Sequence, residues 1–315
     1  MFDGSFLKPR ALRPGGRVAV VAPASPFPEE ALEAGMIELR RLGFEPVTDA
    51  RAFGRAGYVA GSAESRAAAL QAAFEDPSPG AIVAARGGYG SVELLPWLRA
   101  GDIRRFAKLL VGYSDVTALL TFVTTQCGVV AAHGPCVAAG LHLGPAGYDA
   151  STFVRTMTSV EPLGVLPAPG LETLAAGEAS GLLLGGNLTQ LAASMGTPFA
   201  FEPPRGCVLF LEDVGERPYR IDRLLTQLRF AGVLDLAAAV VFGEFPGCDE
   251  ADRSATARDA ALRGLGGFRG PVLWGLPAGH TAGPALTLPL GVRARVVAGP
   301  TASLEILEPA VCADV

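Results

Sequence analysis

Short apolar runs alternate with amphipathic segments in the first half of this chain. Residues 17–22, 81–85 and 108–112 are apolar and stop at or near glycine or proline, as strands buried on both faces do. Between them, residues 29–42 and 63–74 have the pattern of helices packed on a sheet. This alternation predicts an N-terminal α/β domain with a mostly parallel sheet flanked by helices.

The pattern changes in the second half. The Pro- and Gly-rich stretch EPLGVLPAPG begins at residue 161 and predicts a linker over 161–177. We therefore expect an N-terminal domain over 1–160 and a C-terminal α+β domain with barrel-like strands over 178–315. Its predicted elements are strands at 180–184, 207–211, 238–242 and 271–274, an amphipathic helix at 218–231, and antiparallel strands within 286–307.

Composition narrows the class of protein. Of 315 residues, 50% are hydrophobic and 18% are charged, which suits large cores rather than disorder. The net charge of −5 argues against nucleic acid as a partner. No apolar run approaches the roughly 18–20 residues of a membrane-spanning helix. The five scattered cysteines and three unclustered histidines suggest no disulfide framework, metal site or cofactor, and a reduced cytoplasm is expected.

The first candidate for chemistry is Ser114, in the sequence Gly-Tyr-Ser-Asp-Val. A buried strand is expected to end just before it and an apolar helix to begin just after it. A serine on such a turn projects its hydroxyl above the sheet, and the N–H of Asp115 can face a developing oxyanion. Because Val116 replaces the second glycine of the G-x-S-x-G motif, the turn alone also suits Ser114 or Asp115 as a helix N-cap.

A serine nucleophile needs a base and an acid that orients the base. His280 lies among small residues in a loop after a predicted strand, and His133 is the other candidate base. The strand at 207–211 leads into two adjacent carboxylates, Glu212 and Asp213. Either of them could be the acid, or both could be surface charges before the next helix.

A glycine turn, Arg86-Gly87-Gly88-Tyr89-Gly90, follows the strand at 81–85. Its glycines allow the backbone to approach a ligand, and its N–H groups could hold an anion, with Arg86 as a charge partner. It lacks the spacing of a dinucleotide motif and the lysine of a P-loop, so a nucleotide site is disfavoured. A plain turn is the alternative.

Taken together, these segments resemble the LD-carboxypeptidase family of serine peptidases, which includes muramoyl-tetrapeptide carboxypeptidases. The resemblance covers nearly the whole chain in order. It is carried by VAVVAPAS at 18–25, YVAGS at 58–62, ARGGYG at 85–90, VGYSD at 111–115, LLLGGNLTQLAASMGTP at 182–198, LFLEDVGERPYRIDRLLTQL at 209–228 and GLPAGHTAGPALTLPLG at 275–291.

The resemblance implies a catalytic triad of Ser114 as nucleophile, Glu212 as acid and His280 as base. It also implies oxyanion donors on the backbone of Asp115 and of the Gly87–Gly88 turn. The triad would then draw on both domains, with its site in the cleft between them. Further substrate contacts are expected from Arg86 and Tyr89.

The resemblance further implies hydrolysis of an L,D-peptide bond that releases a terminal D-alanine from murein tetrapeptide during peptidoglycan recycling. The expected partner is a small peptide, with no nucleic acid and no membrane, and family members are often homodimers. An immunity-type carboxypeptidase acting on peptide–nucleotide antibiotics such as microcin is the alternative. A non-catalytic peptide-binding relative would not need all three triad residues, and a cysteine amidotransferase would need a cysteine at position 114.

Overall fold

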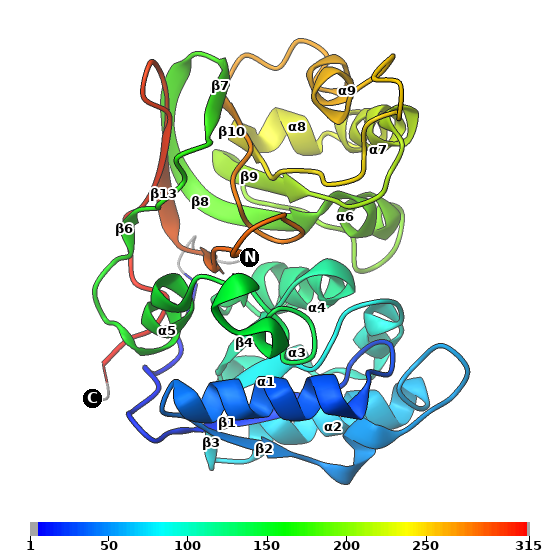
Figure 1. Ribbon diagram of the computed structural model, residues 1–315, viewed down its shortest axis with the longest axis vertical. Coiled ribbons are helices and arrows are strands. Elements are labelled where there is room, and N and C mark those ends of the chain that lie inside the picture. Colours follow the sequence, from blue (N-terminus) through cyan, green and yellow to red (C-terminus); the bar gives the residue numbers. More distant parts are fainter. Residues whose placement is uncertain (1–5, 314–315) are drawn as a thin grey trace. The chain divides into compact units, whose positions relative to one another are not determined.

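A computed structural model describes residues 6–313 of the chain, which divide into two compact units. The first unit comprises the chain through Glu161, together with Gly283–Gly291 and the segment from Pro309 onward. The second comprises Pro162–Ala282 and Val292–Glu308. Each unit contains one sheet with helices packed against it (Figure 1).

The sheet of the first unit is built from buried apolar strands. Its order is β12-β5-β4-β3-β1-β2, and all neighbours are parallel except β12 and β5. Apart from the partly exposed edge strand β2, the strands are buried because both faces are covered, as in other parallel sheets. Their bounds are β1 Arg17–Val21, β2 Glu45–Thr48, β3 Pro79–Ala84, β4 Leu109–Gly112, β5 Ala131–His133 and β12 Leu288–Leu290.

Helices of the first unit begin and end where local chemistry dictates. In α2, Ser62 accepts a hydrogen bond from the N–H of Ser65, and in α5 the side chain of Asp149 caps Thr152 in the same way. The helices are α1 Glu29–Arg41, α2 Ala63–Glu75, α3 Ala100–Arg105, α4 Thr117–Thr121 and α5 Ala150–Thr158. Short 3₁₀ or π turns are η1 Ala50–Phe53, η2 Ser91–Trp97, η3 Ser114–Val116, η4 Phe122–Gln126 and η5 Leu141–Ala146.

The second unit has an eight-stranded sheet of order β6-β14-β13-β8-β9-β10-β11-β7. Its central strands β8, β9, β10 and β11 are parallel, and the outer strands are antiparallel. The strands are β6 Gly164–Val165, β7 Glu172–Ala175, β8 Gly177–Asn187, β9 Cys207–Glu212, β10 Ala237–Phe242, β11 Val272–Trp274, β13 Arg293–Ala298 and β14 Ser303–Ile306.

This second sheet curls, but its strand order is open, with β6 and β7 as the edge strands. The long strand β8 is visibly bent in Figure 1. Thr173 of the edge strand β7 donates a side-chain hydrogen bond of 2.9 Å to the carbonyl of Gly299, directly after β13. The helices of this unit are α6 Leu188–Ser194, α7 Pro218–Phe230, α8 Val233–Leu236 and α9 Ala257–Gly264. The expected α/β fold class, with a second α+β unit, is thus confirmed.

The division of the chain differs from the sequence expectation in two places. Residues 161–177 are not only a linker, because β6 and β7 within them pair into the second sheet. Residues 283–291 and the segment from Pro309 onward belong to the first unit rather than to the second. The reason is strand pairing, since β12 lies antiparallel to β5 of the first sheet, and backbone pairing is not visible in local sequence.

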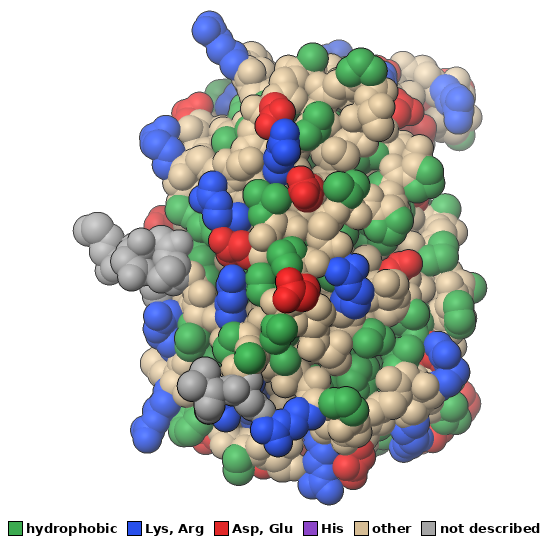
Figure 2. Space-filling model, turned by 90° about the vertical axis from the view of Figure 1, so that its left-hand side faces the viewer, with side chains coloured by type: hydrophobic (Ala, Val, Ile, Leu, Met, Phe, Trp, Pro, Cys, Tyr) green, Lys and Arg blue, Asp and Glu red, His purple; other side chains and the backbone are tan. Residues whose placement is uncertain are grey.

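The parallel strands bring chemistry to their carboxyl ends, where ligands of such sheets bind. Ser114 follows β4 and the glycine turn follows β3, whereas Glu212 ends β9 and His280 lies after β11. Among residues 6–313, no helix combines the length and apolar character that a membrane-spanning helix needs. On the face drawn in Figure 2, side chains of both charge signs are interspersed rather than gathered by sign.

Candidate active site

Ser114 occupies a strained turn between a strand and a helix. Its φ angle is 62°, in the left-handed region that disfavours residues with a Cβ. The turn is held because the N–H of Val116 donates to the carbonyl of Tyr113 at 3.2 Å. The apolar helix α4 that follows runs into the π turn η4 and is anchored by buried leucines. Such strain persists only where the surroundings enforce it, and it is typical of functional sites.

Gly87 lies directly against this turn. A Cβ added at Gly87 would stand 3.0 Å from the Cβ of Ser114 and 3.3 Å from the amide nitrogen of Asp115. Both distances are tighter than ordinary contacts, so a side chain here would press on the serine and on that amide. The absence of a side chain at position 87 therefore keeps space open beside Ser114.

The thiol of Cys136 lies beneath the same two turns. Burial raises the pKa of this thiol to about 12, although hydrogen bonds from the backbone of Tyr113 and Gly87 oppose the shift. Cys136 is therefore a neutral packing group at ordinary pH.

The carboxylate of Asp115 faces away from the serine and into the protein. It is 2% exposed and accepts a hydrogen bond of 2.8 Å from the N–H of Ser91, at the far end of the glycine turn. Burial raises its pKa, and hydrogen bonds from Ser91 and Gly90 only partly offset this shift. Asp115 thus ties the serine turn to the glycine turn through its side chain, and its backbone N–H remains the group of chemical interest.

The glycine turn is fastened to the loop after β1. Ser25 accepts a hydrogen bond of 3.1 Å from the N–H of Tyr89, and its own N–H donates to the carbonyl of Gly87. Arg86 is exposed and donates to the carbonyl of Pro26 at 3.0 Å. Tyr89 is 46% exposed. Both side chains predicted to contact substrate therefore lie at the surface.

In the second unit, Glu212 and His280 form a tight pair. The ring Nδ1 of His280 lies 2.7 Å from Oε2 of Glu212, and the backbone N–H of His280 donates to the same oxygen at 2.9 Å. Glu212 is fully buried, whereas the His280 side chain is 19% exposed. An ionised carboxylate only accepts hydrogen bonds, so Nδ1 carries the proton and Nε2 is the ring's acceptor.

Packing around Glu212 leaves room for nothing larger than glycine at position 279. A Cβ on Gly279 would stand 2.6 Å from Oε2 of Glu212, and its φ of +77° is also one that glycine favours. Burial lowers the pKa of His280, but the hydrogen bond with Glu212 and the charges of Glu212 and Asp213 outweigh it. The net pKa lies above the ordinary histidine value.

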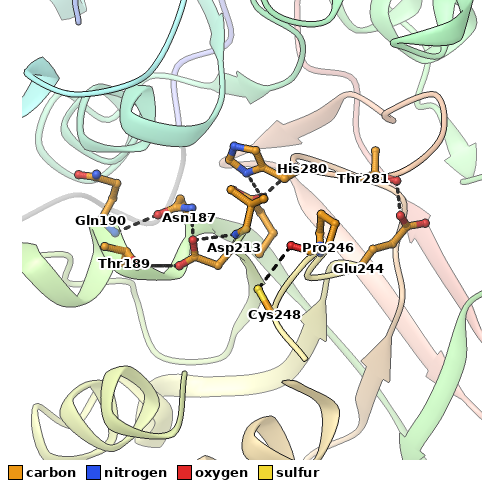
Figure 3. Close-up of polar contacts among 11 residues, drawn as sticks. Asn187, Thr189, Gln190, Asp213, Glu244, Pro246, Cys248, His280 and Thr281 are labelled. Atoms are coloured by element: carbon orange, nitrogen blue, oxygen red, sulfur yellow. Dashed lines mark hydrogen bonds and ion pairs between the residues drawn. The ribbon is translucent and has the colours of Figure 1, made fainter. Parts of the chain in front are cut away.

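Asp213 has a different set of contacts from its neighbour Glu212. Its carboxylate accepts hydrogen bonds from Nδ2 of Asn187 at 3.0 Å and from the N–H and hydroxyl of Thr189 at 2.9 and 2.7 Å. It also accepts one from the N–H of Val214 at 2.9 Å. Figure 3 shows it at the centre of this network. Asp213 therefore joins the end of β8 to the end of β9 and fixes the backbone that presents Glu212.

A third carboxylate supports the loop that carries the histidine. Oε2 of Glu244 accepts hydrogen bonds from the hydroxyl of Thr281 and, at 3.0 Å, from the N–H of Ala282 (Figure 3). Glu244 follows β10, so it comes from a third parallel strand. It clamps the two residues after His280 and restricts movement of the ring.

The other two histidines belong to the first unit. His133 is fully buried at the end of β5, with its ring edge-on to Tyr113 at 6.2 Å between centroids. His142 is in η5. In the part of the chain that the structure describes, no group of three or more histidine, cysteine, aspartate or glutamate side chains is arranged to hold a metal ion.

Within each unit, the structure thus brings together the residues that the sequence singled out. Sequence reasoning missed two supporting residues, Glu244 and Asn187. A signal existed for Glu244, because it follows a buried strand just as Glu212 does. Asn187 lies within the motif at 182–198 and is the N-cap of α6, but its bond to Asp213 depends on β8 lying beside β9.

Comparisons with known proteins agree with the resemblance. Residues 18–134 match the N-terminal domain of LD-carboxypeptidases, and residues 180–296 match the C-terminal domain. A putative carboxypeptidase of Streptomyces coelicolor is 41% identical over 98% of both chains. The murein tetrapeptide carboxypeptidase of Pseudomonas aeruginosa is 34% identical over 85% of this chain and 89% of its own.

A solved structure also shares the fold. The apo form of the microcin C7 self-immunity protein MccF superposes with a TM-score of 0.90 over 97% of this chain and all of its own, at 24% identity. At that identity the likeness speaks for the fold alone.

Proposed function

This chain belongs to the LD-carboxypeptidase family, and from that premise we propose that it is a serine carboxypeptidase. Its proposed reaction is hydrolysis of the L,D-peptide bond of murein tetrapeptide, which releases the terminal D-alanine in peptidoglycan recycling. Ser114 is the nucleophile, His280 the base and Glu212 the acid. The observation that carries the proposal is the buried Glu212, which holds His280 by both its ring and its backbone.

The first step is acylation of the serine. Nε2 of His280 takes the hydroxyl proton as Oγ of Ser114 attacks the carbonyl carbon of the scissile bond. The N–H groups of Asp115 and of the Gly87–Gly88 turn hold the tetrahedral oxyanion. His280 then gives the proton to the amine of D-alanine, the C–N bond breaks, and an acyl-enzyme remains.

The second step releases the shortened peptide. Water loses a proton to His280 and attacks the acyl carbonyl, and the proton returns to Ser114 as the ester bond breaks. Glu212 stabilises the imidazolium in both steps. No cofactor or metal is part of this scheme. The scheme requires the two units to bring Ser114 within hydrogen-bond reach of Nε2 of His280.

One experiment tests the reaction and its substrate. Purified protein and the Ser114→Ala variant are incubated with murein tetrapeptide and, separately, with a peptidyl-adenylate, and the released group is followed by mass spectrometry. Loss of D-alanine with the wild type alone supports the proposal. Cleavage of the adenylate alone replaces it with the immunity-type function, and turnover of neither contradicts a catalytic role on these substrates. The homodimer and the cytoplasmic location stay predictions.

A further inference from the structure

Ser25 holds both of the peptide groups that flank Gly88 in the glycine turn. Its backbone N–H donates to the carbonyl of Gly87 at 3.3 Å, and its Oγ accepts a hydrogen bond of 3.1 Å from the N–H of Tyr89. Ser25 ends the motif VAVVAPAS at 18–25, to which the proposed reaction assigns no step. One residue thus fixes two consecutive peptide planes, next to the glycine that lies against the proposed nucleophile.

The first of these bonds decides where the N–H of Gly88 points. The carbonyl of Gly87 and the N–H of Gly88 belong to one planar trans peptide group, in which they point in opposite directions. Because the N–H of Ser25 holds that carbonyl, the N–H of Gly88 is turned away from the loop after β1. Gly88 is exposed, and its N–H makes no hydrogen bond within residues 6–313. It is therefore available to a ligand.

Close packing holds the turn on the same side. A Cβ added at Gly88 would stand 2.5 Å from Oγ of Ser25 and 2.6 Å from its Cβ. The φ of Gly88 is +106°, a conformation that glycine adopts at little cost. The side chain of Ser25 therefore lies directly against the glycine backbone, and the turn cannot move toward the loop after β1 without displacing it.

The loop that carries Ser25 is itself held from outside. Three of its carbonyls, including those directly before and after Ser25, each accept a hydrogen bond from another segment. The donor and acceptor pairs are Arg66 with Pro23 at 2.6 Å, Ala60 with Ala24 at 2.8 Å, and Arg86 with Pro26 at 3.0 Å. The position of Ser25 is therefore set by its neighbours in space and not by the local chain alone.

Arg66 joins this loop to the far end of the glycine turn. Its side chain is 1% exposed and comes from α2. Its guanidinium also donates to the carbonyls of Gly61 at 3.0 Å and Gly90 at 2.8 Å, and it pairs with Glu93. Charge-assisted hydrogen bonds of this kind are strong. The loop after β1 and the glycine turn are therefore fastened to the same buried group.

We propose that Ser25 is a positioning residue for the oxyanion site, which aims the N–H of Gly88 by holding the peptide groups before and after it. The inference rests on the proposed function, because the oxyanion is the one formed in that reaction. Donors stabilise an oxyanion best when they need not reorient, and a misplacement of about 1 Å can cost about 10²-fold in rate. Without the Ser25 hydroxyl, the peptide between Gly88 and Tyr89 loses its bond, and the turn is free to reorient.

Turnover of murein tetrapeptide by Ser25→Ala measures this effect, because the variant lacks the hydroxyl but keeps the backbone bond to Gly87. We expect kcat to fall about 10- to 100-fold, with KM changed less than about twofold. The acid side of the pH–rate profile should not move, because His280 is untouched. Ser25→Thr keeps an acceptor oxygen and should recover most of kcat. An unchanged kcat in Ser25→Ala, or a change in KM alone, overturns the inference.

A matched control is Ser78→Ala. The hydroxyl of Ser78 also accepts a hydrogen bond, from Arg17 at 3.0 Å, but Ser78 precedes β3, whereas the glycine turn follows that strand. Its kcat should therefore equal that of the wild type. Urea unfolding checks that each variant is folded. Equal losses of kcat in Ser78→Ala and Ser25→Ala would assign the effect to general destabilisation and overturn the inference.

Hydrogen exchange measures the held peptide without any turnover. The amide of Tyr89 donates to Ser25, so NMR should show it exchanging about threefold or more faster in Ser25→Ala than in the wild type. An unchanged exchange rate would show that the hydroxyl does not hold the turn, and this also overturns the inference.

A fluorophosphonate probe separates this inference from the proposed reaction, because it labels an activated serine whatever the natural substrate is. Oγ of Ser114 bonds to phosphorus, fluoride leaves, and the serine proton passes to His280. Intact-mass spectrometry follows the adduct. If the wild type is labelled but releases no D-alanine, the proposed substrate fails, and labelling of Ser25→Ala that is about tenfold slower supports the inference while equal labelling overturns it.

The remaining outcomes are equally distinct. If Ser25→Ala matches the wild type in both labelling rate and kcat, the inference fails and the proposed reaction stands. A wild type that is neither labelled nor active contradicts both.

Discussion

The left-handed backbone of Ser114 leads to a prediction in which two small substitutions rank opposite to their usual order. Ser114→Gly and Ser114→Ala both remove the hydroxyl and both should abolish turnover. They differ in stability, because only alanine keeps the Cβ that conflicts with a φ of 62°. We therefore expect the glycine variant to be the more stable of the two.

The size of the difference follows from two opposing terms. A left-handed conformation costs a residue with a Cβ about 1–2 kcal/mol. Glycine loses more backbone freedom on folding, which costs it about 0.5–1 kcal/mol relative to alanine. The balance favours Ser114→Gly over Ser114→Ala by about 0.5–1 kcal/mol.

A control in a helix should show the reverse order. Ala68 lies on the exposed face in the middle of α2, where glycine is less favourable than alanine by about 0.8–1.0 kcal/mol. Ala68→Gly should therefore lower the free energy of unfolding by about that amount. At both positions the glycine form is compared with the alanine form. An opposite sign of the stability difference at 114 and at 68 therefore reports the backbone conformation of each position.

Urea unfolding at equilibrium measures both pairs. Comparing transition midpoints at a common m-value avoids extrapolation to water, whose error of about 10–15% would hide the difference. Fluorescence and circular dichroism are followed together, because two compact units need not unfold as one. If Ser114→Gly proves less stable than Ser114→Ala, as at position 68, the strained serine turn is refuted.

Three further predictions concern the triad and its scaffold. Because His280 must be neutral to act as base and its pKa is raised, kcat/KM should decline at acid pH with an apparent pKa above the ordinary 6.5 or so. In Glu212→Gln the acid side of the pH–rate profile should move to lower pH, while kcat falls about 10³–10⁴-fold. An unchanged acid side would argue against the pairing of Glu212 with His280. Gly87→Ala should lower kcat about 10²-fold or more by pressing a methyl on the Asp115 amide, with KM changing less, and full activity in steady-state assays would contradict the oxyanion assignment. Arg66→Met should lower the free energy of unfolding by about 3 kcal/mol, because it removes the buried guanidinium that donates to the carbonyls of Pro23, Gly61 and Gly90. Urea unfolding measures this loss. A loss under about 1 kcal/mol would show that Arg66 does not hold these three loops together.

Much of the fold could be predicted from local pattern. The run at 207–211 became β9, Cys207–Glu212, and the periodic segment at 218–231 became α7, Pro218–Phe230. Such elements can be predicted because a strand buried on both faces gives an apolar run, and a helix buried along one stripe gives a periodic apolar pattern. The three-residue strand β5 was not predicted, although β11, which is equally short, was expected at 271–274. Pairing with β4 and β12 defines β5 as a strand.

The sequence by itself determined the family, the fold class and the residue types available for chemistry, because long motifs and apolar periodicity are properties of local stretches. It could not choose between Glu212 and Asp213 without the resemblance. Tertiary structure shows the contacts of each: one carboxylate holds His280, and the other joins Asn187 and Thr189. Adjacent residues on a strand point to opposite faces, so what each one meets depends on the neighbouring strands and loops.

The same holds for the strain at Ser114 and for the contact between the rings of Tyr58 and Tyr89. A φ of 62° at Ser114 exists only because β4, the glycine turn and the following helix are packed around it. Tyr58 and Tyr89 are far apart in sequence and become one surface because Arg66 binds both of their loops. Contacts between distant segments are set by sheet order and by buried polar groups, and these exist only in the folded chain.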